Sequence, residues 1–437
     1  MEINKVKYME IKEKYEKKDE RPLIASQPSP SQQQQHRCKQ ATGWAVAMFH
    51  HRKVVSGVIA SLVLCTVYVI VIMGYGPSAQ DRRFYEILGN KFSFQSTPTE
   101  VLPHNISDYK KILLWNDFFG RRDYFLGTGH SPFVSLGCEY SACYVTYNRE
   151  VFQSTELDAL VWHIRSTDKT FPSTRAPHTR YVFFLEEAPV NQDVDLGPYN
   201  DVFNYTMTYR RDSDIFAPYG EFERLTKPIE EPNIGTGAGE NIAAGKTKMA
   251  AWFVSNCNPQ SGRDILVQQL QKYITVDVYG SCGPLSCPRN DNQACLRMLQ
   301  SDYKFYFSFE NSLCQDYVTE KYFSIVNSNV LPVVYGMAPY RELSPPHSYI
   351  SVRDFPTVKK LADYLIYLAN NHTAYNEYFK WRSHYSLLSR SKSWCRLCEK
   401  LHTDRQEKSY DIHSWYEKNK CVDQATALGD AFFAPDS

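Results

Sequence analysis

The sequence predicts an α/β protein with two lobes, each built around a parallel sheet, preceded by one membrane-spanning helix. Three observations predict this. Short apolar runs alternate with helical stretches from residue 111 onward, a glycine-rich segment at 230–248 interrupts that alternation, and residues 54–73 carry no charge. Alternating strands and helices are typical of parallel sheets, whose ligands bind at the carboxyl ends of the strands. We therefore expect two Rossmann-like lobes that face each other across a cleft.

The composition fits an enzyme-sized globular protein. The chain has 437 residues, of which 43% are hydrophobic and 22% charged, and this length allows two or three domains. The net charge of +1 provides no basic field for nucleic acid, so no nucleic-acid partner is expected. Residues 1–53 carry 11 basic and 6 acidic residues, a net of +5, which leaves a net of −4 for the remainder. The two sides of residue 53 are chemically different.

The uncharged stretch 54–73 predicts a transmembrane signal anchor. Twenty residues at about 1.5 Å each span about 30 Å, the thickness of the hydrocarbon core. About fifty polar residues precede it, which argues against a cleaved signal peptide. A buried core helix is the alternative, although such helices rarely lack charge over this length. Lys and Arg on the N-terminal side hold that end in the cytosol, which makes the bulk of the chain lumenal.

These observations divide the chain into six parts. The expected parts are a disordered cytosolic tail (1–53), the membrane span (54–73), a lumenal stem (74–108), a first lobe with a hinge (109–245), a second lobe (246–400) and a C-terminal tail (401–437).

The cysteines and glycosylation sequons agree with a lumenal location. Ten of the 12 cysteines follow residue 73, and an even, clustered set is typical of disulfides in an oxidising compartment. The pair Cys395-x-x-Cys398 could instead hold zinc or act in redox chemistry, but no second pair at clear ligand spacing and no thioredoxin-like frame accompanies it. The disulfide candidates are Cys138, Cys143, Cys282, Cys287, Cys295, Cys395 and Cys398. The sequons begin at Asn105, Asn204 and Asn371.

The elements follow in order. In the first lobe, apolar runs predict strands at 111–115, 160–162 and 181–185. The second lobe is predicted to contain strands at 249–255, 276–279, 305–309 and 330–335 and helices at 262–273, about 317–327 and 358–370. Gly245-Lys246-Thr247 resembles the end of a phosphate loop. The loop also requires a glycine five positions before Gly245, where this sequence has Glu240, so a hinge is the better interpretation.

The segment 305–323 carries the clearest chemical signal. A buried strand ends at Phe309, polar Glu310 and Asn311 follow, and Lys321 falls in the first turn of the next helix. The N-terminus of a helix favours anions, so a lysine there is unusual unless an external anion such as a phosphate binds beside it. An exposed lysine without a ligand is the alternative.

This segment, FENSxxxDYxTEK, resembles the donor-binding motif of the inverting α1,3-fucosyltransferases of glycosyltransferase family 10, which use GDP-fucose. Other segments resemble the same family in the same order. These are YRRDSDIFAPYG (209–220), KMAAWFVSN (248–256) followed by Arg263, VDVYG (276–280) and VLPVVYG (330–336). The likeness covers roughly residues 110–400 and implies a GT-B-like fold.

The resemblance implies roles for individual residues. Arg263 and Lys321 would bind the diphosphate, because both cations stabilise the charge that grows on GDP as the fucose bond breaks. Glu320 and Asn311 would orient sugar or ribose hydroxyls. Glu310, Tyr317 and Asn256 would complete the donor pocket.

Inversion needs a base opposite the leaving group. The family places it in an ExP segment after a first-lobe strand, which here is Glu187-Ala-Pro189, so Glu187 is the expected base and Glu186 the reserve. The sequence departs from the commoner ESPSH by reading EAPVN, and the doubled Glu leaves the choice open. Two solvated carboxylates at a strand end are the alternative without catalysis.

No metal site and no required cofactor are expected. Asp212-Ser-Asp214 imitates a metal-binding DxD but falls in the first lobe, away from the nucleotide, so a structural role is favoured; Mn²⁺ or Mg²⁺ could still stimulate by screening phosphates.

The segment CGPLSCPR (282–289) looks like the CGxLxCPR element of plant and invertebrate members. It favours an N-glycan acceptor on glycoproteins, with the core GlcNAc ahead of antennal GlcNAc.

The expected protein is a single-pass type II Golgi enzyme, bound to the membrane through one helix and able to form homo-oligomers through the stem or span. The alternatives are an antennal, Lewis-type enzyme, a transferase of another nucleotide sugar, and an inactive membrane-tethered glycan-binding protein.

Overall fold

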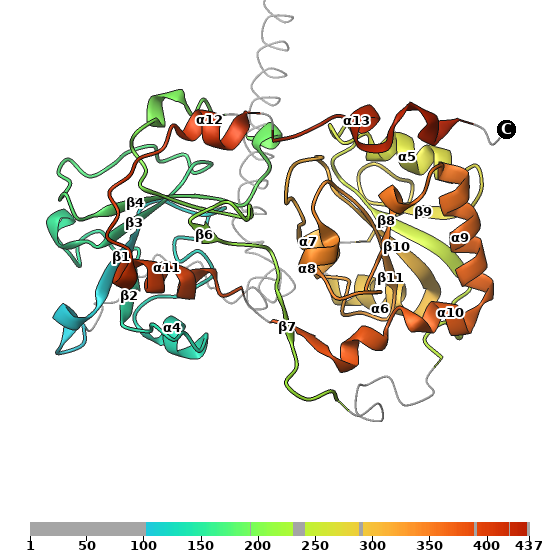
Figure 1. Ribbon diagram of the computed structural model, residues 1–437, viewed down its shortest axis with the longest axis horizontal. Coiled ribbons are helices and arrows are strands. Elements are labelled where there is room, and N and C mark those ends of the chain that lie inside the picture. Colours follow the sequence, from blue (N-terminus) through green and yellow to red (C-terminus); the bar gives the residue numbers. More distant parts are fainter. Residues whose placement is uncertain are drawn as a thin grey trace, which may run out of the picture. The chain divides into compact units, whose positions relative to one another are not determined.

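The computed structural model describes residues 102–192, 194–229, 241–287, 292–388, 391–418 and 420–434 (Figure 1). The expected cytosolic tail and membrane span, and nearly all of the expected stem, lie outside these ranges, as does most of the glycine-rich segment. Within the described ranges, no helix combines the length and apolar character needed to cross a bilayer.

The first lobe contains a six-stranded parallel sheet in the order β2-β1-β3-β4-β5-β6. The predicted strands at 111–115, 160–162 and 181–185 are found as β1, β3 and β4. Every residue of β3 is buried, as expected for a strand covered on both faces. The strands are β1 (Lys110–Leu114), β2 (Cys143–Thr146), β3 (Ala159–His163), β4 (Arg180–Leu185), β5 (Tyr205–Thr208) and β6 (Ile215–Phe216), and the one α-helix described between them is α4 (Ser131–Ser135).

The second lobe contains a five-stranded parallel sheet in the order β12-β11-β10-β8-β9. The strand order changes direction between β8 and β10, and such a switch point opens a crevice for ligands at the carboxyl ends of the strands. The strands are β8 (Lys248–Phe253), β9 (Val276–Tyr279), β10 (Tyr303–Phe309), β11 (Leu331–Tyr335) and β12 (Ile350–Ser351). The helices are α5 (Arg263–Leu270), α6 (Asn292–Asp302), α7 (Glu320–Phe323), α8 (Tyr340–Leu343), α9 (Val358–Asn370) and α10 (His372–Glu377).

Helices cover both faces of the second sheet. Apolar side chains of α5 and α9 share one core with alternate residues of β8, β10 and β11, and Figure 1 shows these two helices on the same side of the sheet. Leu299 of α6 packs with Ala251 and Tyr306 in a separate cluster. A short antiparallel pair, β7 (Phe222–Arg224) with β13 (Tyr385–Leu387), accompanies the two main sheets.

The C-terminal part of the chain returns to the first lobe. Helix α11 (Ser393–Thr403) packs in the core formed by β1, β3 and β4, and α12 (Ile412–Glu417) packs in a second cluster with alternate residues of β3 and β4. Beyond them, α13 (Gln424–Leu428) is followed by Phe432, which is buried in the core of the second lobe. From the sequence, residues up to 400 are expected in the second lobe and 401–437 in a tail, whereas α11 and α12 pack on the first sheet. Their partners on the first sheet lie far away in the sequence, Arg396 and Phe216 for instance being 180 positions apart, so no local pattern indicates this placement.

Candidate active site

The site is built at the carboxyl ends of β8 and β10, where the strand order changes. Glu310 and Asn311 follow β10 directly, and the loop after β8 carries Asn256 and leads into α5 at Arg263. The predicted helix at 317–327 is shorter than expected, because α7 spans Glu320–Phe323 and turns follow it. Thr319 caps this helix by accepting the N–H of Lys321, so Lys321 lies in the first turn as predicted.

Lys321 lies against a buried carboxylate. Its Nζ is 3.4 Å from Oε2 of Glu310, 3.1 Å from Oε1 of Glu320 and 2.9 Å from the hydroxyl of Thr319. Burial works to lower the pKa of Lys321, but the charges of Glu310 and Glu320 outweigh it, so its pKa is raised. Glu310 is 0% exposed, and burial raises its pKa although Lys321 and the Thr319 hydrogen bonds oppose the shift. Glu310 therefore holds a lysine that stays charged.

Arg263 is the second cation of the site. It is 3% exposed, and its Nη1 donates to the carbonyl of Phe309 at 2.7 Å and its Nη2 to that of Asn256 at 3.3 Å. Its Nε has no hydrogen-bond partner among the described residues. Burial lowers the pKa of Arg263, which the negative charge of Glu310 partly offsets. Arg263 in turn lowers the pKa of Lys321, so both cations act on one location around Glu310.

Glu187 follows β4 in the first lobe and is held by several donors. Its Oε1 accepts from the N–H of Ala188 at 3.0 Å, from Nδ2 of Asn191 at 2.9 Å and from the hydroxyl of Tyr317 at 2.6 Å. Its Oε2 lies 4.0 Å from Nη1 of Arg165, and the side chain is 21% exposed. Three hydrogen bonds therefore hold Oε1, while Oε2 can accept a further hydrogen bond.

Glu186 has a different environment. Its side chain is partly buried, and the described residues provide it with neither a hydrogen bond nor an ion pair. Burial, together with the negative charge of Glu320, raises the pKa of Glu186 to about 8. The two adjacent glutamates thus differ, since three hydrogen bonds hold the side chain of Glu187 and the described residues give none to the side chain of Glu186.

Direct contacts join the two lobes at this site. Tyr317, which belongs to the donor motif and is 1% exposed, donates to Glu187, and Asn191 also donates to the hydroxyl of Ser312 at 2.9 Å. Arg211 of the first lobe binds the Asp316 carboxylate through its backbone N–H and its Nε, both at 3.1 Å. The structure therefore brings the expected base and the donor motif together.

The remaining predicted donor residues lie at the same edge. Asn311 accepts the N–H of Ser261 through its backbone carbonyl at 3.2 Å, and its side-chain Oδ1 accepts from Ser312 at 3.4 Å. The side chain of Glu320 is 64% exposed, and Asn256 is exposed as well. Glu320 and Asn256 therefore leave their polar side chains accessible to a ligand.

The Asp212-Ser-Asp214 motif binds basic side chains. Asp212 pairs with Arg210 and lies 3.9 Å from Lys420. Asp214 pairs with Lys408 and accepts from the hydroxyl of Tyr410 at 2.9 Å. Each carboxylate has its own partners, which fits the expected structural role. In the described ranges, the group of potential metal ligands is Cys143, Cys398 and His402, and its two sulfurs already share a disulfide.

The disulfide candidates are all paired, and three more cysteines take part. The bonds are Cys138–Cys395, Cys143–Cys398, Cys257–Cys282, Cys287–Cys295 and Cys314–Cys421. The motif at 395–398 is therefore two separate bonds to the first lobe. Cys257, Cys314 and Cys421 were not singled out, because each stands alone in the sequence.

The three sequons differ in accessibility. Asn105 is exposed, and Asn371 caps α10 with its Oδ1 while its Nδ2 contacts the hydroxyl of Tyr367 at 3.1 Å. The Nδ2 of Asn204 donates to the carbonyl of Lys408 at 2.8 Å. A glycan on Asn204 would have to replace that hydrogen bond.

Sequence reasoning missed the residues that orient Glu187. Asn191 lies only four positions away, so the EAPVN segment itself could have indicated it. Tyr416, whose hydroxyl donates to the backbone carbonyl of Glu187, lies more than 200 positions away and carried no signal.

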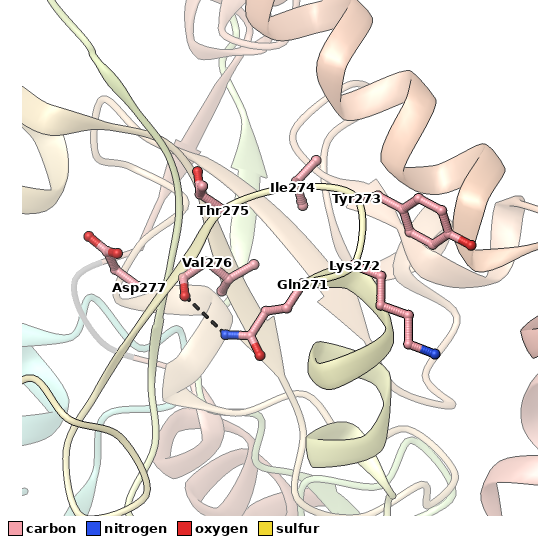
Figure 2. Close-up of a pocket in the computed structure, with 7 residues that line it drawn as sticks. All are labelled: Gln271, Lys272, Tyr273, Ile274, Thr275, Val276 and Asp277. Carbon is pink, nitrogen blue, oxygen red and sulfur yellow. Dashed lines mark hydrogen bonds between the residues drawn. The ribbon is translucent and has the colours of Figure 1, made fainter.

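A hollow of about 460 Å³ lies elsewhere, between α5 and β9 (Figure 2). It is lined by residues 271–277, and Gln271 donates to the carbonyl of Val276 at 3.2 Å. The hollow is at the amino end of β9, whereas the predicted site residues follow the carboxyl ends of the strands. It is therefore separate from the candidate site.

The comparisons with known proteins agree with the geometry. Residues 107–220 match the family model "Fucosyltransferase, N-terminal", and residues 243–415 match "Glycosyltransferase family 10 (fucosyltransferase) C-term". Alpha-(1,3)-fucosyltransferase C of Drosophila melanogaster is 39% identical over 335 residues, which cover 71% of this chain and 78% of that protein. Glycoprotein 3-alpha-L-fucosyltransferase A of the same organism is 35% identical, with 72% and 63% covered.

The name of a human relative gives a different linkage. The 3-galactosyl-N-acetylglucosaminide 4-alpha-L-fucosyltransferase of Homo sapiens is 38% identical over 286 residues, which cover 63% of this chain and 75% of that protein. Both family models and these relatives are fucosyltransferases. The chain belongs to glycosyltransferase family 10 and is a fucosyltransferase.

Proposed function

We propose that this fucosyltransferase moves L-fucose from GDP-fucose, with inversion, to the 3-OH of a GlcNAc on glycoprotein glycans, with the core GlcNAc of N-glycans as the favoured acceptor. One observation carries the proposal. At the switch point, Arg263 donates to the carbonyl of Phe309, Lys321 lies 3.4 Å from the adjacent Glu310, and Tyr317 of the same motif donates to Glu187 at 2.6 Å. Cations for a leaving diphosphate and a carboxylate base thus meet at one site.

Lys321 and Arg263 bind the diphosphate in this proposal. As the bond between fucose C1 and the phosphate oxygen breaks, its electron pair stays on GDP, and fixed cations stabilise this charge more in the transition state than in the ground state. Arg263 contributes its charge from a buried position, since its side chain is 3% exposed and its Nε has no hydrogen-bond partner among the described residues. Exposed Glu320 and the nearby Asn311 accept from or donate to donor hydroxyls, and Asn256 lines the same edge.

Glu187 takes the proton of the acceptor. The acceptor oxygen forms its bond to fucose C1 on the face opposite the departing GDP, and its proton passes to Oε2 of Glu187 while three donors hold Oε1. Burial and the charge of Glu320 raise the pKa of Glu186 to about 8, and no hydrogen bond from the described residues orients its side chain. This contrast favours Glu187 and leaves Glu186 as the reserve.

Mass spectrometry of a defined N-glycan after incubation with GDP-fucose tests the function directly. We expect one added deoxyhexose, and exoglycosidase mapping then separates the core GlcNAc from antennal GlcNAc. The name of the Drosophila relative supports a glycoprotein acceptor, and that of the human relative supports a galactosyl-N-acetylglucosaminide acceptor. Transfer from GDP-mannose but not from GDP-fucose would contradict the proposal, and binding without transfer would indicate a glycan-binding protein.

We also propose that the protein is a single-pass type II membrane protein of the Golgi, anchored by residues 54–73 and able to form homo-oligomers through the stem or span. The uncharged stretch and the flanking basic residues support this. Protease protection of the lumenal part, with a tag on residue 1 accessible from the cytosol, is the expected result in sealed vesicles. Crosslinking of the membrane-bound protein tests the oligomer.

We propose that metal ions stimulate the transfer activity but are not required for it. The carboxylates of Asp212 and Asp214 already bind basic side chains, and Lys321 and Arg263 supply the positive charge at the diphosphate. Activity should therefore persist in a chelator and rise modestly with Mn²⁺ or Mg²⁺. Complete loss in the chelator, with rescue by Mn²⁺, would contradict this.

A further inference from the structure

The C-terminal segment that follows α11 connects the two halves of the candidate site. We call residues 408–418 and 420–423 the strap. Its helix α12 lies on the first lobe, where Ile412 and Tyr416 are fully buried. The next residues lie on the second lobe, where Cys421 is bonded to Cys314. The strap therefore passes from the lobe that carries Glu187 to the lobe that carries the donor motif.

On the first lobe, the strap contacts the segment that carries Glu187. The hydroxyl of Tyr416 donates to the backbone carbonyl of Glu187, and Glu417 accepts from the side chain of Gln192. Nearby, buried Arg210 donates to the carbonyl of Trp415 at 2.6 Å, with its guanidinium 4.0 Å from the Trp415 ring centre. Helix α12 is thus fixed to the first lobe and contacts the backbone of the proposed base.

On the second lobe, the strap pairs with the loop of the donor motif. The N–H of Gln315 donates to the carbonyl of Lys420 at 2.8 Å, and the N–H of Val422 donates to that of Leu313 at 2.9 Å, on both sides of the Cys314–Cys421 disulfide. Tyr317, which donates to Oε1 of Glu187, lies three residues beyond Cys314. The loop that carries the partner of the base is therefore attached covalently to the strap that supports the base.

The chain between the two attachments is short. Cys421 lies five positions after Tyr416, and a fully extended chain spans about 3.3–3.6 Å per residue, so these two residues lie at most roughly 18 Å apart. The disulfide attaches Cys314 of the donor loop to the end of this short tether. Inverting transfer needs the base, the acceptor oxygen and the anomeric carbon in one geometry. A misplacement of about 1 Å in such an arrangement can cost about a hundredfold in rate.

We infer that the Cys314–Cys421 disulfide and Tyr416 are positioning residues that set the distance between the donor loop and Glu187. The inference rests on the proposed function, because it assumes that Glu187 is the base. It concerns the rate of transfer rather than nucleotide affinity, since the contacts of Arg263 and Lys321 lie within the second lobe.

The test compares two double variants of the full chain. Cys314→Ala with Cys421→Ala removes the bond between strap and donor loop, and Cys287→Ala with Cys295→Ala removes a disulfide within the second lobe as the matched control. We expect kcat for transfer from GDP-fucose to fall about tenfold or more in the first variant, with the calorimetric Kd for GDP changed less than about twofold. The control should retain both values.

Three outcomes would overturn the inference. An unchanged kcat would show that the tether does not set the geometry, and a kcat and GDP affinity that fall together would show that it only stabilises the second lobe. An equal fall of kcat in the control would show that any lost disulfide has this effect. A parent chain with no transfer from GDP-fucose would instead contradict the proposed function, and this inference with it.

A second pair of variants applies if the first double variant does not fold. Tyr416→Phe removes the hydroxyl bonded to the Glu187 carbonyl, and Tyr410→Phe removes another strap hydroxyl, which donates to Asp214 at 2.9 Å away from the site. At equal melting temperatures, Tyr416→Phe should lower kcat several-fold more than Tyr410→Phe, with GDP affinity unchanged. Equal kcat values in the two variants would overturn the inference.

Discussion

The donor side and the base side of the site are held by different forces. On the donor side, the charges of Lys321 and Glu310 lie 3.4 Å apart within one short segment, with Arg263 beside them. On the base side, Glu187 is oriented by neutral hydrogen bonds, one of them from Tyr317 in the other lobe. A charge-based site is visible in a local motif, whereas the orientation of a base depends on residues far away in the chain.

The largest expected effect comes from removing the charge on the donor side. Lys321→Met should lower kcat/KM by about a thousandfold or more, because no other flexible cation of the motif replaces it at the diphosphate. Lys272→Met is the matched control, since Lys272 contacts Gln269 at 2.6 Å on the exposed side of the second lobe. Steady-state kinetics at equal circular dichroism measure the effect. Near-normal turnover in Lys321→Met would refute the phosphate role.

The next effect separates the two glutamates. Glu187→Gln keeps the shape of the side chain but cannot take a proton, so kcat should fall by about a hundredfold or more. Glu186→Gln should cost less than that, because the side chain of Glu186 has no partner among the described residues and its raised pKa, about 8, keeps it protonated below that pH. Single-turnover rates with saturating GDP-fucose provide the measurement. If Glu186→Gln shows the larger loss, the two roles are reversed.

A smaller effect tests the link between the two sides. Tyr317→Phe removes the hydroxyl that donates to Oε1 of Glu187 and should lower kcat about tenfold through misorientation of the base. Tyr375→Phe serves as the control, because its buried hydroxyl donates at 2.6 Å to the carbonyl of Lys304, which lies at the amino end of β10 whereas the site follows the carboxyl end. Comparable kcat values in the two variants would show that the contact between the lobes is not used in catalysis.

The smallest effect concerns stability and pH. The pKa of Glu186 is raised from 4.5 to about 8, so between these values the folded protein binds more protons than the unfolded chain. The free energy of unfolding should therefore fall as pH rises from about 4.5 to about 8. Glu186→Gln lacks this contribution, and its melting temperature relative to the parent should increase over that interval. A constant difference would show that Glu186 has an ordinary pKa in the folded protein.

The sequence predicts elements best where their patterns are local. β9 and α9 have the predicted bounds, and α9 combines an apolar face with a capping Thr357. Helix α7 is shorter than expected, because Asp316 adopts a left-handed conformation with φ of 60° and Thr319 places the cap three residues later. Periodicity alone does not reveal a cap inside an apolar segment.

In the candidate site, too, the contacts within one local motif are predictable and the contacts between distant residues are not. Lys321 and Glu310 belong to one motif, so their proximity follows from a strand, a loop and a helix in sequence. The support of Glu187 by Tyr416 needs a helix that returns from the C-terminal end of the chain, and no pattern near either residue indicates it. The pairing of Cys138 and Cys143 with Cys395 and Cys398 likewise depends on the tertiary fold.

That return of the chain affects the order in which the protein can be completed. The bonds Cys138–Cys395 and Cys143–Cys398 span 257 and 255 positions, and α11 supplies part of the apolar core on the first sheet. The ribosome therefore has to synthesise the whole second lobe before the first can be covered and crosslinked. Until then, the nascent first sheet exposes apolar side chains and two unpaired thiols, which makes it a substrate for chaperones and for the enzymes that form disulfides.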